Sequence, residues 1–136
     1  MAGARRKARA IVLQVLYEVD STGHEAAAVL ERTLAGAGLS EENNVFVGEV
    51  VSGVLRDKAN IDATIQRFAT AWPIAQMPLI DRNIIRLAIF EILSDNRVSI
   101  KVAINEAVVL ARRFGSDSTA KFVNGVLGSV SAIAGR

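Results

Sequence analysis

Apolar residues recur every three or four positions along almost the whole chain. No segment alternates apolar and polar residues over the length of a strand. A three-to-four spacing places the apolar side chains on one face of a helix, so it predicts helices throughout. In segment 4–20 the shared face comprises Ala8, Ile11, Val12, Val15, Leu16 and Val19. The pattern therefore predicts an all-α fold of about seven helices.

Residues that favour helix ends mark the boundaries of these predicted helices. Further helices are expected over 24–35, from 41 to about 57, over 61–69, from 78 to about 93, over 100–114 and from about 119 to 134. The expected starting residues are Ser40, Pro78, Ser99 and either Ser118 or Thr119, and the expected stops are Gly36 with Gly38, and Gly115. In segment 100–114, Ala103, Ala107, Leu110 and Phe114 follow the spacing of a packed seam.

Both prolines of the chain fall within the short segment WPIAQMP, at Pro73 and Pro78. Proline interrupts helices, so this segment is the clearest break in the pattern. We expect one domain over residues 1–136, with a subdivision near 71–78 that separates two helical halves. A chain of 136 residues is long enough to bury a core of its own.

Composition excludes several classes of protein. No apolar run approaches the roughly 20 residues of a membrane span, and the N-terminus lacks the features of a secretory signal. The absence of Cys excludes disulfides and thiolate metal sites and fits a cytoplasmic protein. With one His, no nucleophile elbow and no glycine-rich phosphate loop, we expect neither an enzyme nor a cofactor or metal.

Charge is unevenly distributed along the chain. Residues 1–9 contain the bases Arg5, Arg6, Lys7 and Arg9 and no acid, whereas residues 18–49 are strongly acidic. Cations in the first turn of a helix oppose its dipole and repel one another, so they favour an anionic partner. The alternative is a solvated, frayed tail.

Aromatic residues accompany the bases. At about 100° per residue, Tyr17 lies on the same outer face as Arg6, Ala10 and Leu13, about 16 Å further along the axis. In the last helix, Phe122 projects about 100° from the centre of the core face, beside Lys121. Cations that bind phosphates, with aromatics on which bases stack, are typical of RNA-binding proteins.

Two glycines, Gly125 and Gly128, lie inside the last predicted helix, where each costs roughly 1 kcal/mol relative to Ala. We interpret them as sites of close helix packing. The alternative is that they let an RNA strand or a partner approach the backbone.

Three segments, RRKARAIVLQVLY, LIDRNIIRLAIFEIL and KVAINEAVVLARRFGSDSTAKFVNGVLGSV, resemble in order and spacing the NusB family of bacterial transcription antitermination factors. The resemblance covers essentially the whole chain. It implies an all-helical fold with two three-helix halves and binding to the boxA element of single-stranded leader RNA. It also implies a heterodimer with NusE, a ribosomal protein, and entry into an RNA polymerase antitermination complex.

The resemblance also implies roles for individual residues. Arg5, Arg6, Lys7 and Arg9 match the arginine-rich motif of the family, and Tyr17, Lys121 and Phe122 match its RNA-contacting positions. Asp81 matches an acidic position linked to NusE. From the residues themselves, Glu106, Asn105 and Asn124 are interpreted as hydrogen-bonding groups at the edge of the core.

Two other functions are compatible with the sequence. The chain could be a protein-interaction module whose bases bind an acidic protein surface. It could also be a NusB-like substrate-recognition domain detached from an RNA methyltransferase, although no α/β cofactor-binding pattern is present.

Overall fold

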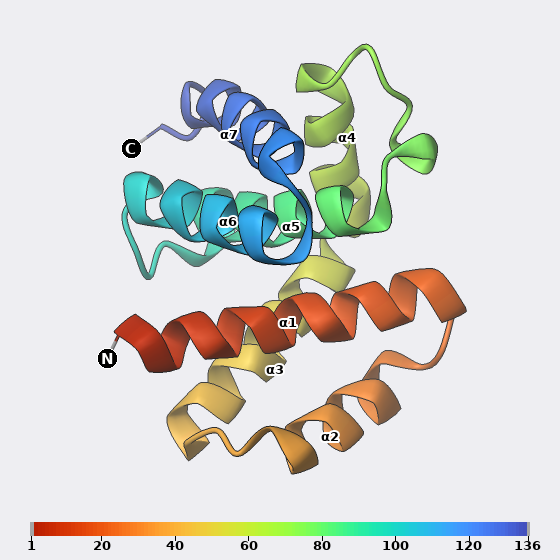
Figure 1. Ribbon diagram of the computed structural model, residues 1–136, viewed down its shortest axis with the longest axis vertical. Helices are drawn as coiled ribbons and strands as arrows, with labels where there is room; N and C mark the ends of the chain where they lie inside the picture. The colour runs from red at the N-terminus through yellow and green to blue at the C-terminus, as the bar shows by residue number, and fades with distance from the viewer. Residues whose placement is uncertain (1, 136) are drawn as a thin grey trace.

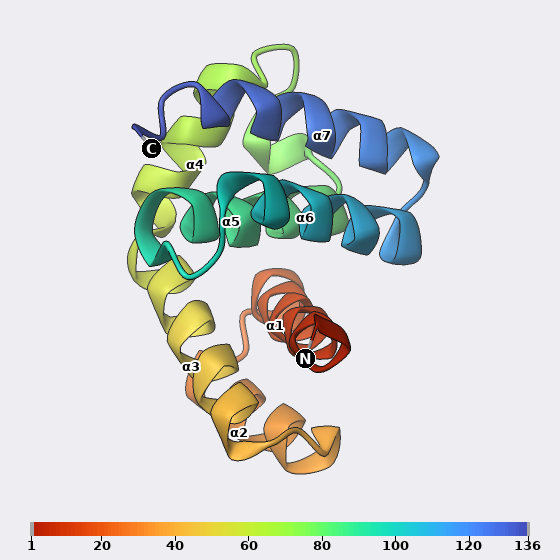
Figure 2. The same cartoon turned by 90° about the vertical axis from the view of Figure 1, so that its left-hand side faces the viewer.

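The computed structural model describes residues 2–135, and within them seven α-helices pack in two layers (Figures 1 and 2). The N-terminal layer consists of α1 (Ala2–Thr22), α2 (Ala26–Ala37) and α3 (Glu41–Arg56). The C-terminal layer consists of α4 (Lys58–Phe68), α5 (Leu79–Phe90), α6 (Ile100–Phe114) and α7 (Asp117–Ser131). The predicted all-α fold is confirmed, whereas the subdivision near 71–78 stays a prediction. None of the described helices is both long and apolar enough to cross a membrane.

Two helices form the centre of the molecule. The buried apolar residues of α5 are Ile84, Ile85, Leu87, Ala88, Ile89 and Phe90, so nearly every side of its second half is covered. Helix α1 packs against α2, α3 and α5 and thereby joins the two layers. By contrast, α2 has Val29 as the one buried side chain among its described residues. The core therefore lies along α1 and α5, with α2 at its edge.

Leu13 shows where the predicted outer face of α1 is wrong. The helical angle groups Leu13 with Tyr17, yet Leu13 is only 2% exposed and lines a groove together with Ile80 and Phe114 of the C-terminal layer. Tyr17, one turn further along, is 40% exposed as predicted. The outer face of α1 is thus half covered by the second layer.

The N-cap residues predicted for α3 and α6 are confirmed, and the one predicted for α7 is not. The Ser40 and Ser99 hydroxyls accept hydrogen bonds from the backbone N–H groups of Asn43 (3.2 Å) and Val102 (3.1 Å). The prediction of Ser118 or Thr119 for α7 is wrong, because Ser116 caps this helix and accepts from the Thr119 N–H at 3.1 Å.

The turn between α6 and α7 depends on a glycine at its first position. A Cβ atom at Gly115 would lie 2.7 Å from Oγ1 of Thr119, a distance that side chains do not tolerate. The seam predicted for α6 is correct at Ala103, Ala107 and Leu110 and wrong at Phe114, which is 41% exposed. Close approach at this turn therefore needs glycine, and Phe114 is left at the surface.

The interpretation of the two interior glycines of α7 is also wrong. A Cβ atom at Gly125 or Gly128 would meet no atom within 4 Å, and both residues are exposed. These glycines do not serve helix packing. They leave a stretch of α7 backbone accessible from solvent.

Helix α5 continues into a short wide turn, the π-helix η2 (Glu91–Asp95), where the sequence had indicated only the end of a helix and a loop. The turn ends at Asn96, whose positive φ of 58° is a conformation that Asn tolerates better than most residues. Its first residue, Glu91, is buried. This turn places a carboxylate inside the protein, close to the N-terminal half of α1.

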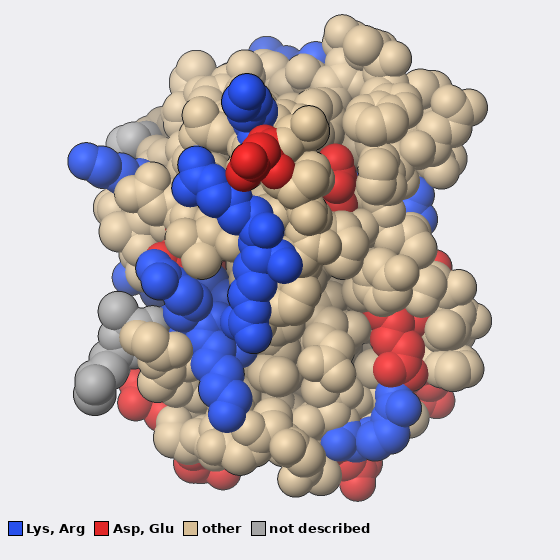
Figure 3. Space-filling view, in the orientation of Figure 1, with Lys and Arg blue, Asp and Glu red and all other residues tan. Residues whose placement is uncertain are grey.

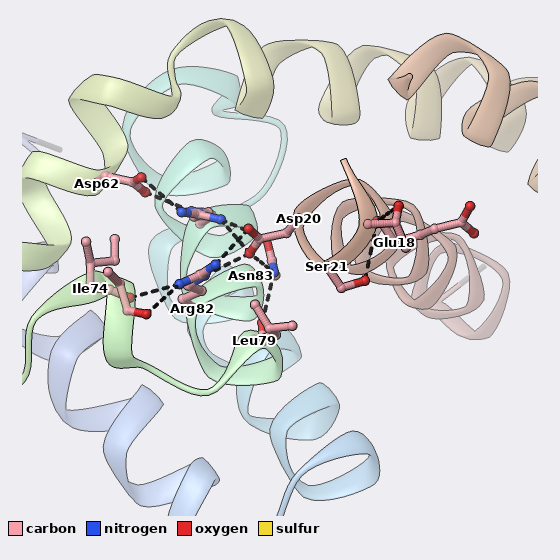
Figure 4. A network of polar contacts seen from close by, with 11 residues as sticks. Glu18, Asp20, Ser21, Asp62, Ile74, Leu79, Arg82 and Asn83 are labelled. Carbon is pink, nitrogen blue, oxygen red and sulfur yellow. Dashed lines mark hydrogen bonds and ion pairs between the residues drawn. The ribbon is translucent and has the colours of Figure 1, made fainter. Parts of the chain in front are cut away.

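A polar network ties the C-terminal half of α1 to the second layer (Figure 4). Asp20 accepts hydrogen bonds from Arg82 (2.7 and 2.8 Å) and Asn83 (2.8 Å) of α5, and Arg86 bridges Asp20 to Asp62 of α4. Burial alone would raise the pKa of the Asp20 carboxyl, but the bonds from Arg82 and Asn83 and the charge of Arg86 outweigh burial and lower it to about 2. Asp20 is therefore ionised at neutral pH and links three helices.

Candidate nucleic-acid interface

The three arginines in the first turns of α1 have acidic partners from other elements. Arg5 lies 3.6 Å from a carboxylate oxygen of Glu42, and its guanidinium stands 4.1 Å from the centroid of the Phe46 ring. Arg6 donates two hydrogen bonds to Glu106, from Nε (3.0 Å) and Nη2 (2.8 Å). Acids distant in sequence therefore compensate part of the charge that favours an anionic partner.

Arg9 is not available to a phosphate, which corrects its predicted role. Its side chain is buried and donates two hydrogen bonds of 2.9 Å to the Glu91 carboxylate. The side chains of Arg9 and Glu91 are only 4% and 2% exposed. Arg9 is thus a structural residue that joins α1 to η2.

Lys7 differs from the three arginines. It is exposed and takes part in none of the ion pairs found among residues 2–135. Figure 3 shows that Lys and Arg side chains gather in a band over α6 and the N-terminal half of α1. Acidic side chains lie around this band: one group borders its upper end, and others lie along the lower edge and toward the C-terminal end of α1 and α2. The uneven charge of the sequence becomes a basic face on one side of the fold.

A groove of about 400 Å³ runs beside α1 within this basic face. We call it the α1–α6 groove; its lining residues are Lys7, Ala10, Ile11, Leu13, Gln14, Tyr17, Ile80, Arg113 and Phe114. Two exposed aromatics, Tyr17 and Phe114, contribute to this lining, and the Arg113 guanidinium lies 4.9 Å from the Phe114 ring centroid. Lys7 and Arg113 add a positive charge from each of the two helices. Aromatic rings flanked by cations suit the stacking of a base and the binding of its phosphates.

Arg113 and Phe114 are the residues of this groove that the sequence analysis missed. Phe114 was assigned to the core because it continues the spacing of Ala103, Ala107 and Leu110. The neighbouring pair Arg112–Arg113 in the last turn of α6 was the available signal, since a helix end rich in cations is commonly at the surface.

The second predicted aromatic contact belongs to a different surface. Phe122 is half-buried and packs edge-to-face on Trp72, with ring centroids 5.7 Å apart. Both rings border a groove of about 480 Å³ that Phe68 also lines, and Lys121 is exposed nearby in the chain. The structure does not bring Phe122 into the α1–α6 groove with Tyr17.

Asp81 is largely buried in the isolated chain. It lies in the first turn of α5 and is only 6% exposed. Burial raises the pKa of its carboxyl, although a hydrogen bond from the Thr119 side chain opposes the shift. In the isolated chain Asp81 contacts Thr119 of α7, and its contact with a partner stays a prediction.

The remaining polar positions divide in two. The interpretation of Glu106 as a hydrogen-bonding group at the core edge is confirmed by its two bonds to Arg6. Asn105 and Asn124 are exposed, and neither side chain takes part in a hydrogen bond among the described residues, so that interpretation is wrong for both. Within residues 2–135 no group of three or more His, Asp or Glu side chains is placed to hold a metal ion.

Comparisons with known sequences converge on one family. Residues 6–132 match the sequence model of a protein family that is described as the NusB family. The transcription antitermination protein NusB of Dehalococcoides mccartyi is 53% identical over 131 residues, which cover 96% of this chain and 92% of that protein. The protein of the same name from Chloroflexus aggregans is 43% identical over 132 residues, covering 96% of this chain and 88% of the relative.

Solved structures agree with the sequence relatives. NusB of T. maritima superposes with a TM-score of 0.88 at 28% identity, covering 94% of this chain and 90% of that one. A crystal structure of the antitermination factors NusB and NusE in complex with dsRNA contains a chain that matches with a TM-score of 0.89 at 22% identity, covering 98% and 99%. At that identity the likeness concerns the fold.

Proposed function

This chain belongs to the NusB family, and from that premise we propose that it is a cytoplasmic transcription antitermination factor that acts by binding rather than by catalysis. In this proposal it recognises the boxA element of single-stranded RNA together with NusE and joins an RNA polymerase antitermination complex. Its relatives from Dehalococcoides mccartyi and Chloroflexus aggregans carry the name of transcription antitermination proteins.

The α1–α6 groove is the observation that carries the RNA-binding part of the proposal. Tyr17 and Phe114 offer two ring faces for bases, and Lys7 and Arg113 offer charges for the adjoining phosphates. Arg5 and Arg6 precede Lys7 in α1 and add positive charge beyond the residues that line the groove. Base stacking gives affinity with little sequence preference, and phosphate contacts fix the path of the strand.

Lys121 and Phe122 remain proposed RNA contacts on the separate surface that Trp72 shares. Arg9 and Asp81 are not part of the proposed RNA interface because both are buried. The chain alone therefore offers a modest number of phosphate contacts, and we expect NusE to tighten RNA binding by linkage.

A titration of labelled boxA RNA, with and without NusE, tests this function. We expect weak binding by the chain alone, tighter binding with NusE, and weaker binding of a scrambled RNA of equal length and composition. Lys7→Ala should lower the slope of log affinity against log salt by about 0.7, the value for one contact to a single strand. Equal affinity for boxA and scrambled RNA, with and without NusE, would show a charged surface without the proposed specificity.

A further inference from the structure

We propose that Glu106 is a positioning residue for RNA binding: it holds one edge of the Arg6 guanidinium and leaves the other edge free for a phosphate group. This inference rests on the proposed RNA-binding function. Under this inference, the negatively charged Glu106 strengthens the binding of RNA, although RNA is itself an anion.

The hydrogen bonds of Arg6 leave part of its guanidinium unused. Arg6 has five N–H groups, and Nε and Nη2 give one each to the two oxygens of Glu106, at 3.0 and 2.8 Å. The other three, including both on Nη1, find no acceptor among residues 2–135. Because the guanidinium is planar, its Nη1 side points away from the carboxylate.

The exposed fractions of the two side chains differ: Glu106 is mostly buried, whereas about half of the Arg6 side chain is accessible from solvent. The Arg6 side chain is 48% exposed, and that of Glu106 is 13% exposed. Glu106 also lies 3.8 Å from Nη1 of the buried Arg9. The hydrogen bond from Arg6 lowers the pKa of the Glu106 carboxyl, so Glu106 remains ionised at neutral pH.

This arrangement favours positioning over competition. A phosphate that displaced Glu106 would have to separate a poorly exposed carboxylate from Arg6 while Arg9 still holds it by charge. A phosphate that binds the Nη1 side displaces nothing, because a guanidinium can donate hydrogen bonds to anions from two of its edges. RNA then meets an arginine whose side chain is already ordered, which reduces the entropy lost on binding.

Arg5 and Glu42 provide a contrast on the same helix. Their contact is a single 3.6 Å approach, and the Glu42 side chain is 85% exposed. Glu42 therefore contributes charge to the basic face without holding an arginine in a defined orientation. Glu42→Gln is the matched control for Glu106→Gln, because each removes one negative charge near the same turn.

The test compares the affinities of these two variants for labelled single-stranded boxA RNA at low salt. General electrostatics predicts that removing either acid strengthens RNA binding. Positioning predicts that Glu106→Gln weakens it, by about threefold to tenfold, the cost of ordering one long side chain. In an Arg6→Ala background, Glu106→Gln should cause no further loss, a result that a merely structural role would not give.

Equal or tighter RNA binding by Glu106→Gln overturns the inference, provided that the wild-type chain binds boxA RNA in the same titration. If the wild-type chain binds no RNA with or without NusE, the proposed function and the inference fail together. Arg6→Lys keeps the positive charge, but an ammonium group has no second edge with which to bind a phosphate while it binds Glu106. This variant therefore tests the positioning role if Glu106→Gln does not fold. It should lose RNA affinity about as much as Glu106→Gln, and wild-type affinity in Arg6→Lys overturns the inference.

Discussion

Replacement of Arg9 by Met separates folding from RNA binding at the basic turn. Methionine retains much of the length of the side chain but removes the charge and both hydrogen bonds to Glu91. In the folded variant the Glu91 carboxylate stays within a site where it is 2% exposed and loses the charge and the two hydrogen bonds of Arg9. We therefore expect Arg9→Met to destabilise the protein and to leave the RNA contacts of the folded state intact.

The expected size of this effect follows from the burial of the pair. Removal of one member of a buried ion pair costs about 3 to 5 kcal/mol. For a chain of 136 residues, 3 kcal/mol corresponds to a fall in Tm of roughly 10 °C. The free energy of unfolding should come from urea denaturation followed by circular dichroism, with thermal melting as a second measurement.

Two control variants make the interpretation specific. Arg9→Met combined with Glu91→Gln leaves no carboxylate charge at position 91, so it should recover part of the lost stability. Lys7→Ala, at an exposed position, should change the free energy of unfolding by less than about 0.5 kcal/mol. The effects on RNA binding should be the reverse of the effects on stability. Lys7→Ala should reduce the slope of log affinity against log salt, and Arg9→Met should leave this slope unchanged below its melting temperature.

The reasoning fails if Arg9→Met melts like the wild type and loses RNA affinity with a smaller salt slope. That outcome would place Arg9 on the phosphates, as the sequence alone had indicated, and would mean that the Glu91 pair is not formed in solution.

Three further predictions concern other parts of the molecule. Tyr17→Ala should cost about 1 to 3 kcal/mol of RNA affinity with little change in Tm, and unchanged affinity in the RNA titration would exclude stacking at this ring. Because the folded pKa of Asp20 is about 2 and its ordinary value is 3.8, its contribution to stability should be complete above pH 4 and decline toward pH 2. Asp20→Asn should flatten that part of the curve of unfolding free energy against pH, and an unaltered curve would contradict the network. Gly125→Ala and Gly128→Ala should each raise the unfolding free energy by up to about 1 kcal/mol, because open space surrounds both positions, and a loss would contradict it.

Most of the fold could be predicted because helices are local structures. The spacing of apolar residues in segment 4–20 reflects only the geometry of one helix, and Ser40 and Ser99 bond to the backbone three residues later. The same local geometry explains why Tyr17 was correctly predicted to be exposed.

The errors occur where distant segments meet. Helical angles place Arg9 at the edge of a face, but its burial depends on Glu91, 82 residues later in the chain. Phe114 continues the spacing of the core residues of α6. It is the last residue of this helix, and it lines the open α1–α6 groove instead of packing in the core. Asp81 lies in the first turn of α5, where Thr119 of α7, 38 residues later in the chain, bonds to it. A single sequence gives the faces of each helix but not what covers them.

The edge position of α2 has a consequence for hydrogen exchange. Helix α1 is anchored to the second layer near its start by Arg9 and near its end by Asp20, so its central amides should exchange only on global unfolding. Helix α2 has Val29 as its one buried side chain and packs chiefly on α1, so it can open as a separate cooperative unit. Such opening would remove no residue from the lining of the α1–α6 groove, because none of its lining residues comes from α2. The amides of the helices that carry the basic face should thus exchange slowly and those of α2 faster. Substitutions in α2 should have little effect on the basic face.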